Sequence, residues 1–116
     1  MEHYNKKYKL NEKKEIIECT LHEWGRFLET PEKIVKQENV GDYWVSTVFL
    51  GIDHNFTRPY NNNKPILFES MIFKSKDIGQ DSWQERYCTY QEALDGHNAI
   101  VERLKNGTQP FYGDDE

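Results

Sequence analysis

An aspartate and a histidine stand side by side where the most apolar segment of the chain ends. Asp53 and His54 follow the run 43–52, which is rich in β-branched and aromatic residues. A histidine at a strand end beside a carboxylate can act as a general base or as a metal ligand. The simpler interpretation is that Asp53 bonds the local backbone while His54 is hydrated, because connections that follow strands use such residues for turns. The sequence favours the simpler interpretation and leaves the other open.

A second charged candidate lies inside an apolar segment. Glu69 interrupts the apolar run 66–73, where an unpaired carboxylate would be costly and must either face water or find a partner. Arg86, in the run 83–88 that follows, is the predicted cross-strand partner. We expect a structural ion pair here, or a carboxylate facing water, and not a catalytic carboxylate.

A third candidate, His97, lies on the apolar stripe expected for the last helix. A lone histidine in that position is expected to be a hydrogen-bonded core residue. A metal site made by Asp53, His54 and His97 is the competing hypothesis, but their spacing matches no dense ligand motif, so no metal or cofactor is predicted. Cys19 and Cys88 form no CxxC pair, and we expect both to be reduced thiols without a nucleophilic role.

The segment 53–65 is the best candidate for ligand binding. It is long for a connection in so short a chain, and connections of this length are often functional. Arg58 offers a planar guanidinium for a carboxylate or phosphate, and Tyr60 offers a flat amphipathic ring. A polar, asparagine-rich excursion without function is the equal alternative. No GxSxG, Walker A or GxGxxG motif is present, so we expect a binding protein and not an enzyme.

The composition limits the partners and the size of the core. The chain has 116 residues, suited to one domain, and its 36% of apolar residues includes many aromatic side chains with large areas to bury. Fifteen basic residues against 20 acidic ones give a net charge of −5, which argues against direct nucleic-acid binding. The N-terminal segment lacks a signal-peptide pattern and no apolar run reaches the length of a membrane span, so we expect a cytoplasmic protein with no membrane contact.

The elements that must position these residues can be predicted from periodicity and capping. Two capping boxes, Thr20 with Glu23 and Thr89 with Glu92, predict helix starts. Strands are expected at 15–19, 33–38, 43–52, 66–73 and 83–88, and helices at 21–29 and from 90 to the stop signal at Gly107.

Together these elements predict an α+β domain, an antiparallel sheet of about four to five strands with two helices mainly on one face. An all-β barrel is the less favoured alternative. The expected division is a mobile polar arm at 1–15, one domain at 16–107 and an acidic tail at 108–116.

Three blocks of sequence resemble a family of small proteins encoded in bacteriophage and prophage genomes. The blocks are 46–56 (STVFLGIDHNF), 67–73 (LFESMIF) and 86–93 (RYCTYQEA), closing on Gly96-His97. The resemblance extends over roughly residues 16–105, but it supplies no catalytic residues to carry over. Where family members have a shorter loop rich in glycine and proline, this chain has TRPYNNNKP at 57–65, so a shared site there does not transfer directly.

The resemblance implies a phage-encoded accessory protein that binds a host protein, for example an anti-CRISPR or other inhibitor of bacterial defence. An acidic domain can compete for the nucleic-acid site of such a partner. The alternative is a small-nucleotide-binding protein that uses Arg58, Tyr60 and Arg86. A metal-dependent enzyme and a minor morphogenesis factor are further alternatives, and the sequence leaves the oligomeric state undecided.

Overall fold

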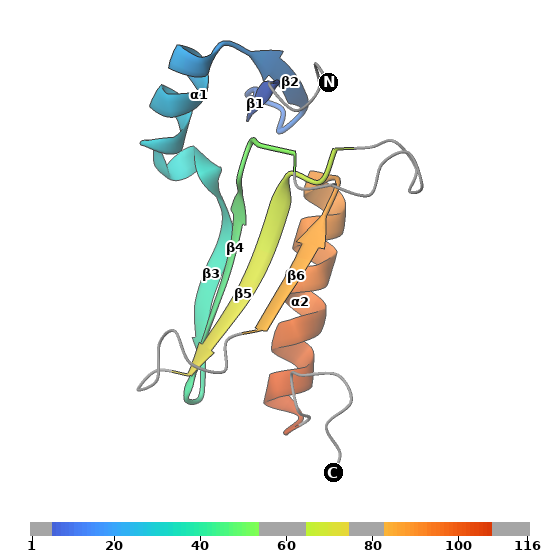
Figure 1. Ribbon diagram of the computed structural model, residues 1–116. Helices are drawn as coiled ribbons and strands as arrows, with labels where there is room; N and C mark the ends of the chain where they lie inside the picture. The colour runs from blue at the N-terminus through green and yellow to red at the C-terminus, as the bar shows by residue number, and fades with distance from the viewer. Residues whose placement is uncertain (1–5, 54–64, 75–82, 108–116) are drawn as a thin grey trace.

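The computed structural model describes residues 6–53, 65–74 and 83–107, and the fold is α+β, as the sequence predicts. A four-stranded antiparallel sheet carries one long helix against one face, and a hairpin with a shorter helix lies at one end of this sheet (Figure 1). The elements in chain order are β1 (Lys7–Leu10), β2 (Ile16–Cys19), α1 (Leu21–Leu28), the short 3-10 helix η2 (Pro31–Lys33), β3 (Ile34–Val40), β4 (Tyr43–Phe49), β5 (Phe68–Lys74), β6 (Trp83–Tyr87) and α2 (Tyr90–Lys105).

The four-stranded sheet is a meander in the order β3-β4-β5-β6, and each neighbouring pair is antiparallel. β4 is an interior strand, as its apolar sequence predicts. Side chains of a strand alternate between the two faces of a sheet. Val45, Thr47 and Phe49 of β4 are buried on the face that α2 covers, so one polar residue shares this face with two apolar ones.

Helix α2 begins with the predicted capping box. The Thr89 hydroxyl accepts a hydrogen bond from the Glu92 amide at 3.0 Å, and the Glu92 carboxylate accepts one from the Thr89 amide at 3.2 Å. The buried side chains of α2 form one stripe toward the sheet: Ala93, His97, Ile100 and Val101. Within the described ranges, no helix has both the length and the apolar character needed to cross a membrane.

Helix α1 packs at the end of the sheet and not on the face that α2 covers. Its capping box at Thr20 and Glu23 is also confirmed. Trp24 donates its ring N–H to the carbonyl of Leu50 at 3.1 Å, just beyond β4. Phe27 meets Phe49 edge-on, with ring centroids 5.7 Å apart. α1 therefore closes one end of the core, and of the two predicted helices only α2 covers the sheet.

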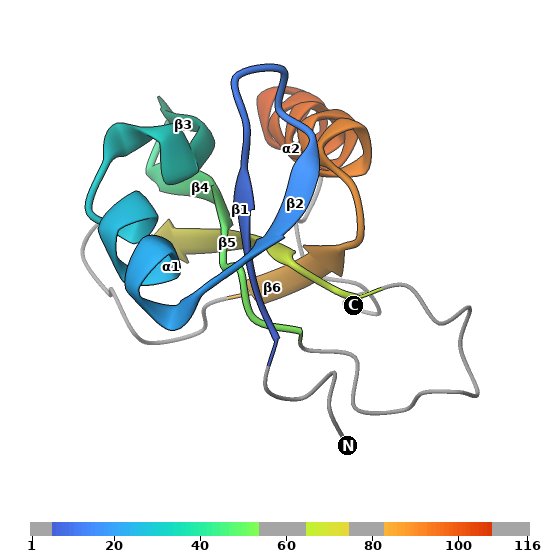
Figure 2. The same cartoon turned by 90° about the horizontal axis from the view of Figure 1, so that it is seen from above.

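Strand β1 corrects the expectation of a mobile polar arm for residues 6–15, while residues 1–5 and the expected tail at 108–116 lie outside the described residues. β1 pairs with β2 in an antiparallel hairpin, and the Tyr8 amide donates to the carbonyl of Gly51 at 3.0 Å. Leu10 is buried, and Tyr8 packs against the same core cluster. Lys7 and Lys9 flank Tyr8, and Leu10 stands between Lys9 and Asn11. This short, polar segment therefore resembles an unstructured one in the sequence. The hairpin crosses the end of the sheet beside α1 (Figure 2), and we call the hairpin and α1 together the N-terminal lobe.

Candidate functional site

Asp53 binds the backbone, as the simpler interpretation of the sequence predicts. It is 5% exposed, and its Oδ1 accepts a hydrogen bond from the Ile66 amide at 2.9 Å. This bond joins the two ends of the connection between β4 and β5. His54, Arg58 and Tyr60 belong to the same candidate site, but they lie outside the described residues. Asp53 therefore has a structural role at the base of this connection.

Glu69 and Arg86 form the predicted cross-strand pair. They are direct partners in the β5–β6 register, and Arg86 Nε donates to Glu69 Oε2 at 3.1 Å. The Glu69 side chain is 11% exposed and that of Arg86 is 42% exposed. Arg86 also donates to Gln84 at 3.3 Å. The pair lies on the face of the sheet away from α2, and the guanidinium is already engaged by two side chains of the protein.

A chain of polar side chains crosses the interface between α2 and the sheet. His97 is fully buried, and its Nδ1 lies 2.7 Å from Thr47 Oγ1 while its Nε2 lies 3.1 Å from Glu38 Oε2. Thr47 Oγ1 lies 2.5 Å from Ser70 Oγ, and the Tyr87 hydroxyl donates to Ser70 Oγ at 3.0 Å. These five residues come from β3, β4, β5, β6 and α2. They therefore link the helix to every strand of the sheet.

The direction of each of these hydrogen bonds follows when Glu38 is ionised and the His97 ring is neutral. An ionised Glu38 only accepts, so Nε2 of His97 carries the proton and Nδ1 of the neutral ring accepts from Thr47. Thr47 has then used its own proton and accepts from Ser70, which in turn accepts from Tyr87. The bonds therefore run in one direction, from Tyr87 to Glu38, and every link has a donor and an acceptor.

Burial makes His97 a neutral residue. Removal of the ring from water lowers the pKa of His97, while the hydrogen bond and the charge of Glu38 act in the opposite direction and Lys36 adds a small lowering effect. The lowered pKa supports the neutral ring on which the bond directions depend. The burial of His97 and its two hydrogen bonds confirm the expectation of a hydrogen-bonded core histidine.

Glu38, His97 and Thr47 present a carboxylate, an imidazole and a hydroxyl in the order of a hydrolase triad. A substrate cannot reach the hydroxyl, however. A catalytic hydroxyl must reach a scissile carbonyl beside oxyanion donors. Thr47, Ser70 and His97 are each 0% exposed. The Thr47 hydroxyl is also held by a second residue, Ser70. The arrangement can orient α2 on the sheet, and it offers no nucleophile to a substrate.

The described residues contain no other group suited to metal or thiol chemistry. No three histidine, cysteine, aspartate or glutamate side chains within 6–53, 65–74 and 83–107 gather as metal ligands would. Neither Cys19 nor Cys88 forms a disulfide. Partial burial raises the pKa of Cys19, and the carboxylates of Glu23 and Glu18 add to this effect against an opposing contribution from Lys9. The Cys19 thiol is therefore protonated near neutral pH and is a weak nucleophile.

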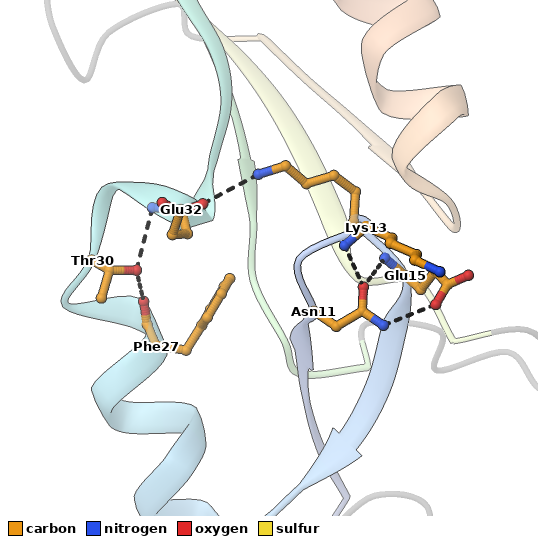
Figure 3. A network of polar contacts seen from close by, with 7 residues as sticks. Asn11, Lys13, Glu15, Phe27, Thr30 and Glu32 are labelled. Carbon is orange, nitrogen blue, oxygen red and sulfur yellow. Dashed lines mark hydrogen bonds and ion pairs between the residues drawn. The ribbon is translucent and has the colours of Figure 1, made fainter.

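The turn of the hairpin is held by its own side chains. Asn11 Oδ1 accepts from the amides of Lys13 and Glu15 at 2.8 and 2.9 Å, and Asn11 Nδ2 donates to Glu15 Oε1 at 2.8 Å (Figure 3). Lys14 has a positive φ of 67°, and its ammonium lies 3.3 Å from Glu32 of η2. The turn is thereby fixed to the segment that leads into β3.

Two large hydrophobic side chains are exposed among the described residues, and both belong to the N-terminal lobe. They are Ile17, at 38%, and Leu21, at 66%. In the β1–β2 register Lys9 lies opposite Ile17 and Lys7 lies opposite Cys19, so these four residues share one face. An open depression of about 490 Å³ beside Ile17 is lined by hairpin residues alone. We call Ile17 and Leu21, with the two lysines, the lobe patch.

Four members of the polar chain were not predicted from the sequence. Glu38, Thr47, Ser70 and Tyr87 were not candidates, although a signal for two of them exists. Thr47 and Ser70 each stand between apolar residues two positions away on strands that are otherwise apolar on the same face. A polar residue in such a row needs a buried partner. The sequence could not name the partner, because the five residues span positions 38 to 97.

Comparison of the chain with protein families, curated proteins and solved structures finds no match. The function is therefore inferred from the geometry of the residues and from the resemblance noted in the sequence.

Proposed function

We propose that this chain is a phage-encoded accessory protein that acts in the bacterial cytoplasm by binding a protein of the host. The observation that carries the proposal is the lobe patch. Ile17 and Leu21 expose apolar area on the N-terminal lobe, and Lys7 and Lys9 share the hairpin face of Ile17. An apolar centre with a charged margin is typical of a protein-binding surface. The sequence resemblance supports the phage origin.

The candidate polar side chains bond to other residues of the protein, and this supports binding in preference to catalysis. The His97 chain has its donors and acceptors matched, and its hydroxyls and imidazole are buried. Arg86, which a nucleotide phosphate would need, is held by Glu69 and Gln84. The exposed lobe patch thus remains the better candidate for contact with another molecule. Inhibition of a bacterial defence system, of the anti-CRISPR kind, is the particular role that the resemblance favours.

A competing version of the same function uses acidic charge to occupy a nucleic-acid site. The exposed side of α2 carries Asp95 and Glu102, and the whole chain has a net charge of −5. This version predicts that the α2 surface, and not the lobe patch, contacts the partner. It also predicts strong weakening by salt, because exposed charges are screened over about 10 Å at 0.1 M.

The test is affinity capture from a bacterial lysate with three matched forms of the tagged protein. The forms are the natural chain, a patch variant with Ile17→Asp and Leu21→Asp, and an α2 variant with Asp95→Asn and Glu102→Gln. We expect one dominant host protein that the natural chain and the α2 variant retain and the patch variant loses.

If only the α2 variant fails to capture the host protein, the contact surface is the acidic side of α2 and not the lobe patch. Capture of no host protein by the natural chain, at low and at physiological salt, would refute the proposed function. A thermal-shift panel of nucleotides would then follow, since a ligand at about 100 times its Kd adds about 2.7 kcal/mol of stability.

A further inference from the structure

Among the described residues, β3 is an edge strand of the four-stranded sheet. β3 is the first strand of the sheet order, and within the described ranges no other strand pairs with its outer edge. It extends over seven residues, Ile34–Val40, at the margin of the sheet (Figure 1). An open strand edge presents unpaired N–H and C=O groups and is a template for a further strand.

The register shows which backbone groups of β3 face outward. A two-residue turn, Gly41-Asp42, joins β3 to β4, and the positive φ of Gly41 (62°) fits a type II′ turn. The residues that flank such a turn exchange hydrogen bonds, and the bonding direction alternates along the strand. Glu38 and Lys36 therefore bond toward β4, while the backbone groups of Gln37 and Asn39 point away from the sheet.

The side chains of this edge are complementary to those of a second copy. In an antiparallel pair centred on Gln37, Gln37 lies opposite Gln37 of the other copy, and Lys36 lies opposite Glu38 in both directions. Opposite charges directly across a strand pair are favourable. Lys36 Nζ lies 3.0 Å from Asn98 Oδ1, and Glu38 Oε2 lies 3.1 Å from His97 Nε2. Both charged side chains are therefore already positioned on the α2 side of the edge.

We propose that β3 pairs with β3 of a second copy of this chain, about a two-fold axis at Gln37. The contact is the same surface on both copies, as a closed dimer requires. It joins the two sheets into one and places both α2 helices on the same side, because the axis is perpendicular to the sheet. The bulge in β3 lies between Ile34 and Lys36, so the residues at the centre of the contact are regularly paired with β4.

The first test is sedimentation equilibrium of the full chain over a wide concentration range, with two matched variants. Gln37→Pro removes an outward N–H that the β3–β4 ladder does not use, and proline is tolerated on such an edge. It also removes the side-chain bond from Gln37 to Ser46, which is 2.8 Å long. Ser46→Ala removes the same side-chain bond and leaves the edge backbone intact.

We expect the natural chain and Ser46→Ala to form dimers, and Gln37→Pro to raise the dimer Kd by about tenfold or more, since each lost 1.4 kcal/mol is a factor of ten. A natural chain that is monomeric at every concentration overturns the proposal. Equal dimer Kd values for the natural chain and a folded Gln37→Pro variant also overturn it, because the dimer would then use another surface.

Two further measurements remain decisive if Gln37→Pro fails to fold. Lys36→Glu places like charges opposite Glu38 and should weaken the dimer. In a background with both native cysteines replaced by serine, Gln37→Cys should cross-link on oxidation. Paired Cα atoms of such a strand pair lie about 5.5 Å apart, within disulfide reach.

Ser46→Cys is the control for this cross-link, because Ser46 lies on the next strand and its symmetry mate is about 14 Å away. Cross-linking of Ser46→Cys and not of Gln37→Cys overturns the proposal. These outcomes are independent of the proposed function, since the lobe patch and the edge of β3 are separate surfaces and host capture is read with different variants.

Discussion

Replacement of Thr47 by valine tests whether the buried polar chain stabilises the fold. Valine has nearly the shape of threonine, so Thr47→Val leaves no cavity and removes only the hydroxyl. That hydroxyl donates to His97 and accepts from Ser70, and all three residues are 0% exposed. The variant thus leaves one buried acceptor and one buried donor without this partner.

The magnitude follows from the two groups that lose a partner. A buried group left unsatisfied costs about 1–3 kcal/mol, and the new methyl group returns about 0.8 kcal/mol. We expect Thr47→Val to lower the free energy of unfolding by about 1–5 kcal/mol, a large part of the 5–15 kcal/mol typical of a domain. Urea denaturation followed by tryptophan fluorescence measures this loss, and the m-value should stay constant.

Thr47→Ser is the matched control. It keeps the hydroxyl and removes the methyl group, so it should cost about 1 kcal/mol. The polar chain therefore predicts that the serine variant is more stable than the valine variant, whereas apolar burial alone predicts the reverse. A valine variant as stable as the natural chain, or more stable than the serine variant, would refute this account of the core.

Three further predictions concern other parts of the described structure. Because burial lowers the pKa of His97 in the folded state, the unfolded chain takes up a proton first as the pH falls through about 6.5. The free energy of unfolding should thus fall below pH 6.5, by at most about 1.4 kcal/mol per pH unit for this group. The urea midpoint of His97→Gln should lack this part of the dependence on pH. A Cβ at Gly96 would lie 2.4 Å from the Tyr87 ring, so Gly96→Ala should destabilise by about 1–3 kcal/mol of overpacking less about 1 kcal/mol of helix propensity. Gly25→Ala, where a Cβ meets nothing within 4 Å, should instead raise the melting temperature, and a similar shift in both variants would contradict the packing argument. Asp53→Ala should cost about 1–3 kcal/mol of stability because it removes the acceptor of the Ile66 amide. Asp53→Asn keeps an oxygen and should cost less. Equal losses in calorimetry would show that the bond to Ile66 is unimportant.

The parts of the fold predicted from sequence depend on local chemistry. The capping boxes at Thr20 and Thr89 bond to amides three residues away, so both helix starts can be predicted from short segments. The β-branched and aromatic content of 43–52 predicts a strand in the same way, and β4 covers Tyr43–Phe49 of it. The pairing of Glu69 with Arg86 was also predictable, because a carboxylate in an apolar strand requires a partner and the next strand offers one cation.

Other features escaped prediction because their signals are short or distant. β1 has four residues, two of them lysines, and only its pairing with β2 and the burial of Leu10 make it a strand. The N-terminal lobe likewise depends on the contact of Trp24 with the carbonyl of Leu50, 26 positions away. Local propensity does not encode such contacts.

The sequence by itself therefore determined the α+β class, the helix starts, the central strand and the core position of His97, because each follows from the side chains of one segment. Only the tertiary structure decided which groups surround His97. Thr47, Ser70 and Glu38 become its partners, directly or through a hydroxyl, because the strand registers and the docking of α2 bring them together. The physical reason is that hydrogen bonds act over about 3 Å, so the identity of each partner is fixed when separate elements pack and not by their order in the chain.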